Sequence, residues 1–215
     1  SKYWQSLNGT WKFHWAPNPD ERPADFHEVG FDASAWDNIP VPSSWNIVGL
    51  QKDGTQKYGT PIYVNQPVIF QHRVAVGDWK GGVMRTPPTH WTTYKHRNEV
   101  GSYLRTFSVP ADWKGREVFI TFDGEDTFFY HRINGKNVGF SKNSRNSAEF
   151  NITPYLNEEG ENTVAVEVYR SSDASFLEAQ DMFRLPGIFR TVAIQSRPSV
   201  RVRDLVVKPD LDENY

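Results

Sequence analysis

Hydrophobic side chains recur at every second position in short runs along this chain, and this alternation constrains the fold more than any other feature. The run 11–15 places three aromatic rings on one face of an extended segment, and the runs 118–122 and 164–168 alternate in the same way. Because successive side chains of a strand point to opposite faces, each run predicts a half-buried β-strand. Further strands are expected over 104–109, 127–133, 189–195 and 200–207.

Turn-forming residues separate these runs. Asn134-Gly135 follows the aromatic run 127–133, and this dipeptide is the strongest short signal for a β-hairpin. Asp123-Gly124 and Pro198 mark other turns. Short strands spaced by turns predict an all-β fold, either a β-sandwich or a jelly roll. No long helical period is present, so helix is expected only as single turns, near 34–36 or 153–156.

Two stretches do not read as strands. Residues 40–66 are rich in Pro, Gly, Ser and Asn, and residues 77–99 contain Gly81-Gly82 and Pro87-Pro88. Long loops of this kind are usually functional or mobile.

Composition excludes several classes of function. The formal net charge is −2 with no long run of Lys or Arg, so a nucleic-acid partner is not expected. No stretch of about 18 apolar residues exists, so no membrane-spanning helix is expected. The absence of cysteine excludes disulfides and thiolate metal sites. With 8 Trp, 9 Tyr and 14 Phe, the core is expected to consist largely of aromatic rings.

Acidic residues offer the first candidates for catalysis. Glycoside hydrolysis uses two carboxyl groups, about 5 Å apart in retaining enzymes. Asp173, Glu178 and Asp181 lie close together in sequence in a polar and aromatic setting. The alternative is that one of them forms a structural ion pair with Arg184 or Arg190.

Histidine and serine give weaker signals. No two histidines have metal-ligand spacing, and no serine lies in a Gly-x-Ser-x-Gly motif. His131 lies within the aromatic run 127–133, so it is expected to pack as a strand residue rather than to bind a ligand.

Saccharide binding is the second candidate chemistry. Sugar rings stack on aromatic faces, and amides and carboxylates satisfy the hydroxyls. The segment 61–67 contains Tyr63, Asn65 and Gln66, and Trp45, Asn46 and Trp91 are further candidates. The alternative is that each such aromatic belongs to the core of a sandwich rich in rings.

Three segments resemble glycoside hydrolase family 2, and the large bacterial β-galactosidases in particular. The first is Leu-Asn-Gly-Thr-Trp-Lys-Phe at 7–13. The second is Val-Pro-Ser-Ser-Trp at 41–45, followed by Pro-Ile-Tyr-Val-Asn at 61–65. The third is Asp-Met-Phe-Arg-Leu-Pro-Gly-Ile-Phe-Arg at 181–190. Their order along nearly the whole chain makes the resemblance specific.

The resemblance implies a galactose-binding-domain-like jelly roll over residues 1–200. Residues 201–215 would be the truncated start of an immunoglobulin-like domain, which a (β/α)₈ barrel follows in the family. That barrel supplies the acid/base and nucleophile glutamates of a retaining hydrolase. No catalytic residue is therefore expected in this fragment, which alone would be inactive.

Site residues are also implied by the resemblance. Asn65 and Asp181 match family residues that contact the galactosyl group, and Gln66 would approach the sugar beside them. Asp181 would also be a ligand to a sodium ion shared with the barrel, because hard cations take oxygen ligands. The parent enzyme is expected to use sodium and magnesium, and the fragment itself no cofactor.

The resemblance also implies binding partners, and several alternative functions stay open. The resemblance implies a galactoside substrate, contacts with the chain's own immunoglobulin-like and barrel domains, and a homo-oligomer. The alternatives are an independent carbohydrate-binding module, the same domain of a family 2 β-glucuronidase or β-mannosidase, and a purely structural domain. Two features depart from the family: Phe183 stands where a Trp is often found, and residues 77–99 form a longer insertion.

Overall fold

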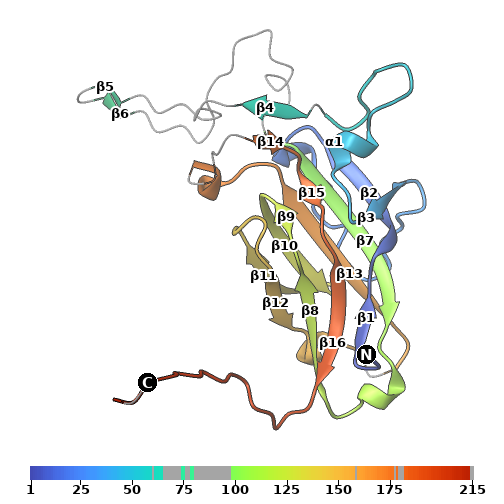
Figure 1. Cartoon of the computed structure of the whole chain (residues 1–215). Helices are drawn as coiled ribbons and strands as arrows, with labels where there is room; N and C mark the ends of the chain where they lie inside the picture. Colours follow the sequence, from blue (N-terminus) through green and yellow to red (C-terminus); the bar gives the residue numbers. More distant parts are fainter. Residues whose placement is uncertain are drawn as a thin grey trace.

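Two antiparallel sheets face each other in a computed structural model of the chain (Figure 1). The structure describes residues 1–59, 61–64, 74–75, 78–79, 98–157, 159–176, 178 and 182–213. The four-stranded sheet has the order β1 (Trp4–Ser6), β16 (Val192–Arg197), β8 (Glu117–Phe122), β12 (Ala148–Asn151). The six-stranded sheet has the order β11 (Lys136–Ser141), β10 (Phe128–Ile133), β13 (Glu161–Tyr169), β7 (Val100–Ser108), β2 (Gly9–Ala16), β3 (Asp37–Val41). The all-β jelly-roll sandwich expected from the sequence is confirmed.

Short elements lie around these sheets. Three two-stranded ladders pair β14 (Met182–Arg184) with β4 (Ile62–Val64), β15 (Gly187–Ile188) with β9 (Glu125–Asp126), and β5 (Val74–Ala75) with β6 (Asp78–Trp79). In the described ranges, helix is limited to α1 (Trp45–Val48) and the 3₁₀ turns η1 (Pro19–Glu21), η3 (Ala111–Trp113), η4 (Thr153–Tyr155) and η5 (Asp173–Phe176). The single helical turn expected near 153–156 is therefore present, whereas 34–36 forms a turn without helix. None of the helices in the described ranges is long and apolar enough to cross a membrane.

The core lies between the two sheets and is rich in rings, as the composition predicts. Phe122 of β8 packs against Phe129 of β10 across the sandwich, with ring centroids 4.7 Å apart. The largest fully buried side chains include Trp11, Trp45 and Trp113. Each large apolar side chain buried in this way contributes about 1.5–3 kcal/mol, so this layer supplies the main driving force for folding.

The hairpin predicted at Asn134-Gly135 joins β10 to β11. Both residues have positive φ, 50° and 79°, as a two-residue hairpin turn of type I′ requires. The Asn134 amide nitrogen also donates to Asn162 Oδ1 at 2.8 Å, and Asn134 Oδ1 accepts from the backbone N–H of Thr163 at 2.8 Å. The turn is thereby fastened to β13.

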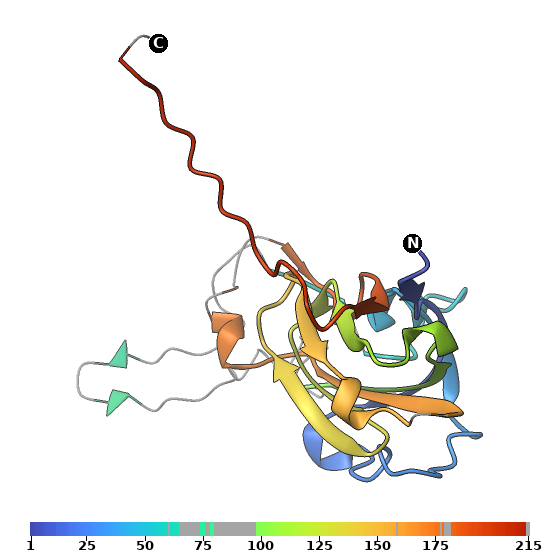
Figure 2. The same cartoon turned by 90° about the horizontal axis from the view of Figure 1, so that it is seen from below.

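The C-terminal strand predicted over 200–207 is wrong. Residues 198–213 contain no strand. Arg201 still donates to Glu117 of β8, and the segment after it runs away from the sandwich (Figure 2). Val200 is 90% exposed and Val202 82% exposed. The sequence alternates, but no strand of the described chain pairs with it, and isolated strands are not stable in water. The strand predicted at 189–195 is shifted, because β16 begins at Val192.

His131 is a packed strand residue, as the sequence predicts. Its side chain has no exposed surface and lies 4.3 Å from the Phe150 ring and 5.4 Å from the Phe122 ring, measured between centroids. Neither ring nitrogen forms a hydrogen bond within the described part of the chain. Burial lowers the pKa of His131 to about 3, so the imidazole is neutral in the folded protein.

Replacing His131 with Leu should reduce the loss of stability in mild acid. Between the ordinary pKa of histidine, 6.5, and its folded value of about 3, the unfolded chain binds a proton that the folded chain does not. Stability therefore falls as pH decreases through this window. From pH 7.5 to 5.0, His131→Leu should lose about 2 kcal/mol less than the unsubstituted chain, as measured by urea unfolding. Equal losses in both proteins would contradict the assignment.

Candidate functional site

The ladder of β4 with β14 marks the end of the sandwich where the predicted sugar contacts belong (Figure 1). Val64 is paired with Met182 in this ladder. Asn65 follows Val64 in the sequence, and Asp181 precedes Met182. Asn65, Gln66 and Asp181 themselves lie outside the described residues, as do Trp91 and most of the 77–99 insertion. The ladder therefore positions the chain segments that lead into both predicted contacts.

Two aromatic rings project from this ladder into the surroundings. Tyr63 and Phe183 are cross-strand partners, with ring centroids 5.1 Å apart. Their exposed fractions are 53% and 59%, which is high for rings of this size. Exposed apolar pairs of this kind are typical of surfaces that another molecule or domain covers.

A buried ion pair lies where β7 begins and β13 ends. Arg170 Nη1 donates to Glu99 Oε1 at 2.6 Å, and both side chains are at least 96% buried. Trp45 Nε1 donates to the other carboxylate oxygen at 3.2 Å. The backbone N–H of Arg170 also donates to the Glu99 carbonyl at 3.0 Å, which extends the β7–β13 ladder by one residue. The pair joins α1 and the ends of two central strands.

The same carboxylate fixes the start of the long loop. Gly59 has a φ of +64°, and a Cβ at this position would lie 2.4 Å from Glu99 Oε1. Only glycine satisfies both the left-handed backbone and the close approach. The backbone at Gly59 therefore lies directly against the Glu99 carboxylate.

Glu178 anchors the segment that leads to Asp181. Its carboxylate accepts from the Ser144 N–H at 3.0 Å and from the Ser144 hydroxyl at 2.7 Å. The buried Arg184 donates to the main-chain carbonyl of Glu178 at 2.5 Å. Glu178 is thus a structural carboxylate, although its partner is a serine rather than the arginine considered from the sequence.

Arg190 is also structural, but its acceptors differ from expectation. The sequence left open an ion pair between Arg190 and one of the three candidate carboxylates. Arg190 Nη1 instead donates to the carbonyl of Arg145 at 2.7 Å, and more weakly to that of Asp123 at 3.5 Å. Carbonyls at turns carry unpaired lone pairs, and a guanidinium satisfies them efficiently.

Trp45 and Asn46 belong to the core. Both are fully buried, and the Asn46 amide donates to the Tyr58 carbonyl at 2.6 Å. Trp45 packs on Phe13 and closely against Gly101. Neither can stack against a sugar, so the core alternative is correct for both.

Two adjacent buried carboxyl residues, Glu125 and Asp126, form β9. Asp126 accepts from Arg145 Nη2 at 3.2 Å and lies 2.7 Å from the Thr127 hydroxyl. Its neighbour Glu125 is 99% buried, and neither of its carboxylate oxygens has a hydrogen-bond partner in the described chain. Burial, reinforced by the charge of Asp126, raises the pKa of Glu125 to about 9. Glu125 is therefore a neutral acid at physiological pH.

Sequence reasoning missed these polar pairs. Glu99 and Arg170 are 71 residues apart, and Ser144 and Glu178 are 34 apart, so no local motif indicates them. Nothing in the sequence distinguishes Glu125 from a solvated acid. Across the described ranges, no three His, Asp or Glu side chains gather as a cation site would need.

Comparison with known proteins gives consistent results. Residues 4–198 match the family profile described as "Glycosyl hydrolases family 2, sugar binding domain". A β-galactosidase of Priestia megaterium is 45% identical over 215 residues, which cover 100% of this chain and 19% of the relative. The β-galactosidase large subunit of Lactobacillus helveticus is 38% identical, and the match covers 100% of this chain and 33% of that subunit. The chain thus spans only about a fifth to a third of the length of these relatives.

Solved structures share the fold. β-Glucuronidase 2 of Bacteroides uniformis superimposes with a TM-score of 0.62 at 23% identity, covering 91% of this chain and 18% of that one. A β-glucuronidase of an uncultured Clostridium gives a TM-score of 0.62 at 18% identity, covering 99% of this chain and 32% of that one. At such identities the likeness establishes the architecture alone.

Breaking the Glu99–Arg170 pair should strongly destabilise the chain. Arg170→Met leaves a carboxylate buried without its cation, and removal of one partner of a buried pair costs about 3–5 kcal/mol. Lys57→Met is the matched control, because the side chains of Lys57 and its partner Asp37 are 49% and 42% exposed. The control should cost about 1 kcal/mol or less. Denaturant unfolding measures both, and equal costs would refute the anchoring role.

Glu125→Gln should stabilise the chain increasingly as pH rises. Between pH 4.5, the ordinary pKa of the acid, and about 9, the folded chain holds a proton that the unfolded chain has lost. The stability of the unsubstituted chain therefore falls with rising pH in this window, by up to about 1.4 kcal/mol per unit. Glutamine does not titrate, so the difference between the two proteins should grow from pH 5 to pH 8 in urea unfolding. A constant difference would show that Glu125 is ionised in the fold.

Proposed function

The chain belongs to the sugar-binding domains of glycoside hydrolase family 2, and from this premise we propose that it is the non-catalytic N-terminal domain of a retaining β-galactosidase. In that role it forms one wall of an active site whose catalytic carboxyls lie in a barrel elsewhere in the parent chain. The substrate class is terminal β-D-galactosides. The fragment alone does not hydrolyse them.

One observation carries the proposal. The pairing of Val64 with Met182 joins the two segments that lead into Asn65 and Asp181, although these residues are 116 positions apart in the sequence (181 minus 65). A shared contact with one ligand needs such a junction. The anchors at Glu99 and Glu178 support it, because a site on a fixed base loses less freedom when a sugar binds.

The proposed roles follow from oxygen and amide chemistry. The Asp181 carboxylate accepts hydrogen bonds from sugar hydroxyls, and the Asn65 amide both donates and accepts. Gln66 lines the sugar next to Asn65. These groups position the galactosyl ring for a nucleophile and an acid/base carboxyl about 5 Å apart, as retaining hydrolysis requires. They orient substrate and move no proton.

The Asp181 carboxylate suits a sodium ion, but it provides only part of the coordination that the ion needs. We propose that Asp181 is one of its ligands and that the barrel supplies the others, because a single carboxylate does not complete a cation site. The ion supplies positive charge that holds sugar oxygens. Magnesium is proposed for the parent enzyme outside this chain.

The exposed rings of Tyr63 and Phe183 are suited to packing against another domain beside this site. Rings that are more than half exposed gain burial when a second domain packs on them. We propose the barrel as that domain, an immunoglobulin-like domain beginning near residue 201, and a homo-oligomeric parent. Phe183 in place of a Trp leaves a smaller ring in this interface.

The alternative assignment is the corresponding domain of a β-glucuronidase. The solved structures named above favour it, but their identities of 23% and 18% establish the fold only. Identities of 45% and 38% to β-galactosidases over the whole chain favour the galactosidase assignment.

Asp181→Asn in the full-length parent tests the shared site. The substitution removes the negative charge at constant size, so kcat/KM on an aryl β-galactoside should fall by about 10- to 100-fold. The activity should also lose its response to added sodium. Asp112→Asn is the matched control, because Asp112 is an exposed residue of η3, a turn that follows β7 in the sequence and belongs to neither β4 nor β14. Unchanged activity and sodium response in Asp181→Asn would leave the domain a structural partner only.

A further inference from the structure

The connection between β11 and β12 contains a turn at Ser144 and Arg145 with an unusual backbone. Ser144 is 5% exposed, and Arg145 has a φ of 69°. A positive φ is uncommon for a residue other than glycine, and it persists only where the surrounding structure holds it. The contacts of this turn therefore show what the strained backbone serves.

Ser144 holds the Glu178 carboxylate with two donors. Its backbone N–H donates to Glu178 Oε1 at 3.0 Å, and its hydroxyl lies 2.7 Å from Oε2. The same hydroxyl lies 3.1 Å from the Thr127 carbonyl, and the shorter distance assigns its one proton to Glu178. Because each carboxylate oxygen meets its own donor, both the position and the rotation of the carboxylate are fixed.

Arg145 fastens the turn itself. Its Nη2 donates to Asp126 Oδ2 at 3.2 Å, and its carbonyl accepts from Arg190 Nη1 at 2.7 Å. Asp126 belongs to β9, and Arg190 follows β15, the strand that pairs with β9. The β9–β15 ladder thus holds the turn, and Ser144 has a fixed base from which to hold Glu178.

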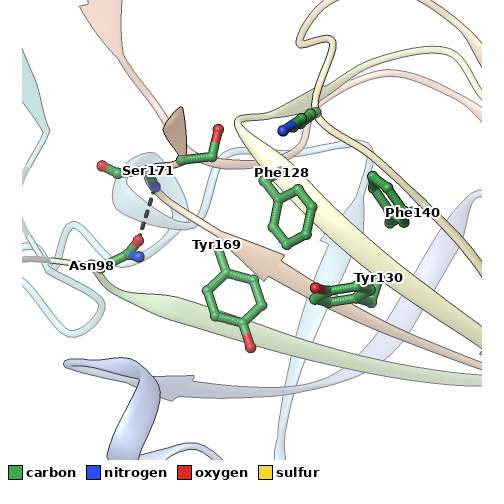
Figure 3. A pocket seen from close by; sticks show the side chains of 8 residues that line it. Asn98, Phe128, Tyr130, Phe140, Tyr169 and Ser171 are labelled. Carbon is green, nitrogen blue, oxygen red and sulfur yellow. Dashed lines mark hydrogen bonds between the residues drawn. The ribbon is translucent and has the colours of Figure 1, made fainter. Parts of the chain in front are cut away.

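The chain that leads to Glu178 is also tied to the sandwich at its start. The Ser171 N–H donates to Asn98 Oδ1 at 2.9 Å, directly after the end of β13 (Figure 3). The Glu178 N–H donates to the Ala174 carbonyl at 3.1 Å, which continues the turn of η5. These contacts bring Glu178 to the Ser144 turn, where its side chain is held.

The described residues on the two sides of Asp181 are both held by hydrogen bonds. On one side, the Glu178 carboxylate is bound by Ser144, and its main-chain carbonyl accepts from Arg184 Nη1 at 2.5 Å. On the other side, Met182 begins β14, which pairs with β4. Asp181 lies three residues after the first of these anchors and one residue before the second.

We propose that Ser144 is a positioning residue for the substrate contact at Asp181, an inference that rests on the proposed function. Ser144 holds Glu178, and Glu178 holds the segment that carries Asp181, so Ser144 acts without touching the sugar. A side chain on a segment that is already ordered binds its ligand without the entropic cost of ordering that segment. Loss of the Ser144 hydroxyl therefore weakens substrate binding although every group that contacts the substrate is still present.

Ser144→Ala in the full-length parent tests this role. KM for an aryl β-galactoside should rise about tenfold, as is typical when the partner of a contacting group is removed. The value of kcat should stay within about twofold, because the ordering cost weakens substrate and transition state alike. A merely structural role would lower thermal stability and the yield of folded enzyme, and would leave KM unchanged.

Ser147→Ala is the matched control. Ser147 is an exposed serine in the same connection, and its hydroxyl also donates to a carboxylate, Asp123 Oδ1, at 3.1 Å. This variant loses the same kind of hydrogen bond without affecting Glu178, so its KM should equal that of the unsubstituted parent. Equal increases of KM in Ser144→Ala and Ser147→Ala would overturn the proposal.

A double variant tests whether Ser144 acts through Glu178. Ser144→Ala combined with Glu178→Ala should raise KM no further than Glu178→Ala alone, because one contact can be lost only once. Additive increases would contradict the proposed route. If Ser144→Ala does not fold, Glu178→Gln takes its place, since it keeps the size of the side chain and loses one of the two acceptors. KM should then rise by a smaller factor than in Glu178→Ala, and an unchanged KM would overturn the proposal.

Hydrogen exchange of the same proteins gives a readout that does not depend on activity. The peptide that contains Glu178, whose N–H is bonded to the Ala174 carbonyl, should exchange faster in Ser144→Ala than in Ser147→Ala. Unchanged exchange, or an unchanged KM in Ser144→Ala, overturns the positioning role, and a fall in the activity of Asp181→Asn would still support the proposed function. If Asp181→Asn is fully active, the proposed function fails and the positioning role fails with it.

Discussion

The buried ion pair between Glu99 and Arg170 is the interaction that holds together α1, the start of β7 and the end of β13. Two charges removed from water are tolerated only when both are paired and hydrogen-bonded. Here Trp45 supplies an additional donor, and the backbone of Arg170 closes the β7–β13 ladder beside it. Gly59 is required because the carboxylate occupies the space of a side chain. Three segments distant in sequence therefore meet at one point, and both segments that lead to the predicted sugar contacts start there.

Elements of the fold could be predicted where the sequence signal was local. The prediction failed for a segment whose structure depends on a pairing strand. The turn at Asn134-Gly135 specifies its own backbone conformation, so the hairpin followed from two residues. His131 could be assigned to the core because its strand alternates around it. The run 200–207 alternates equally well, yet it forms no strand, because pairing needs a neighbour that the described chain does not provide. Periodicity shows which face of an extended segment is apolar, but it does not show whether another part of the protein packs on that face.

For the candidate site, even less could be predicted from local sequence. Glu178 was a candidate catalytic carboxylate, and only the tertiary structure shows that Ser144 engages it. Nothing near Glu125 in sequence indicates its isolation from water, which arises from the packing of β9 against β15. Asn65, Gln66 and Asp181 remain predictions, because they rest on the resemblance and lie outside the described residues. The structure adds the junction of β4 with β14, which no single segment of sequence contains.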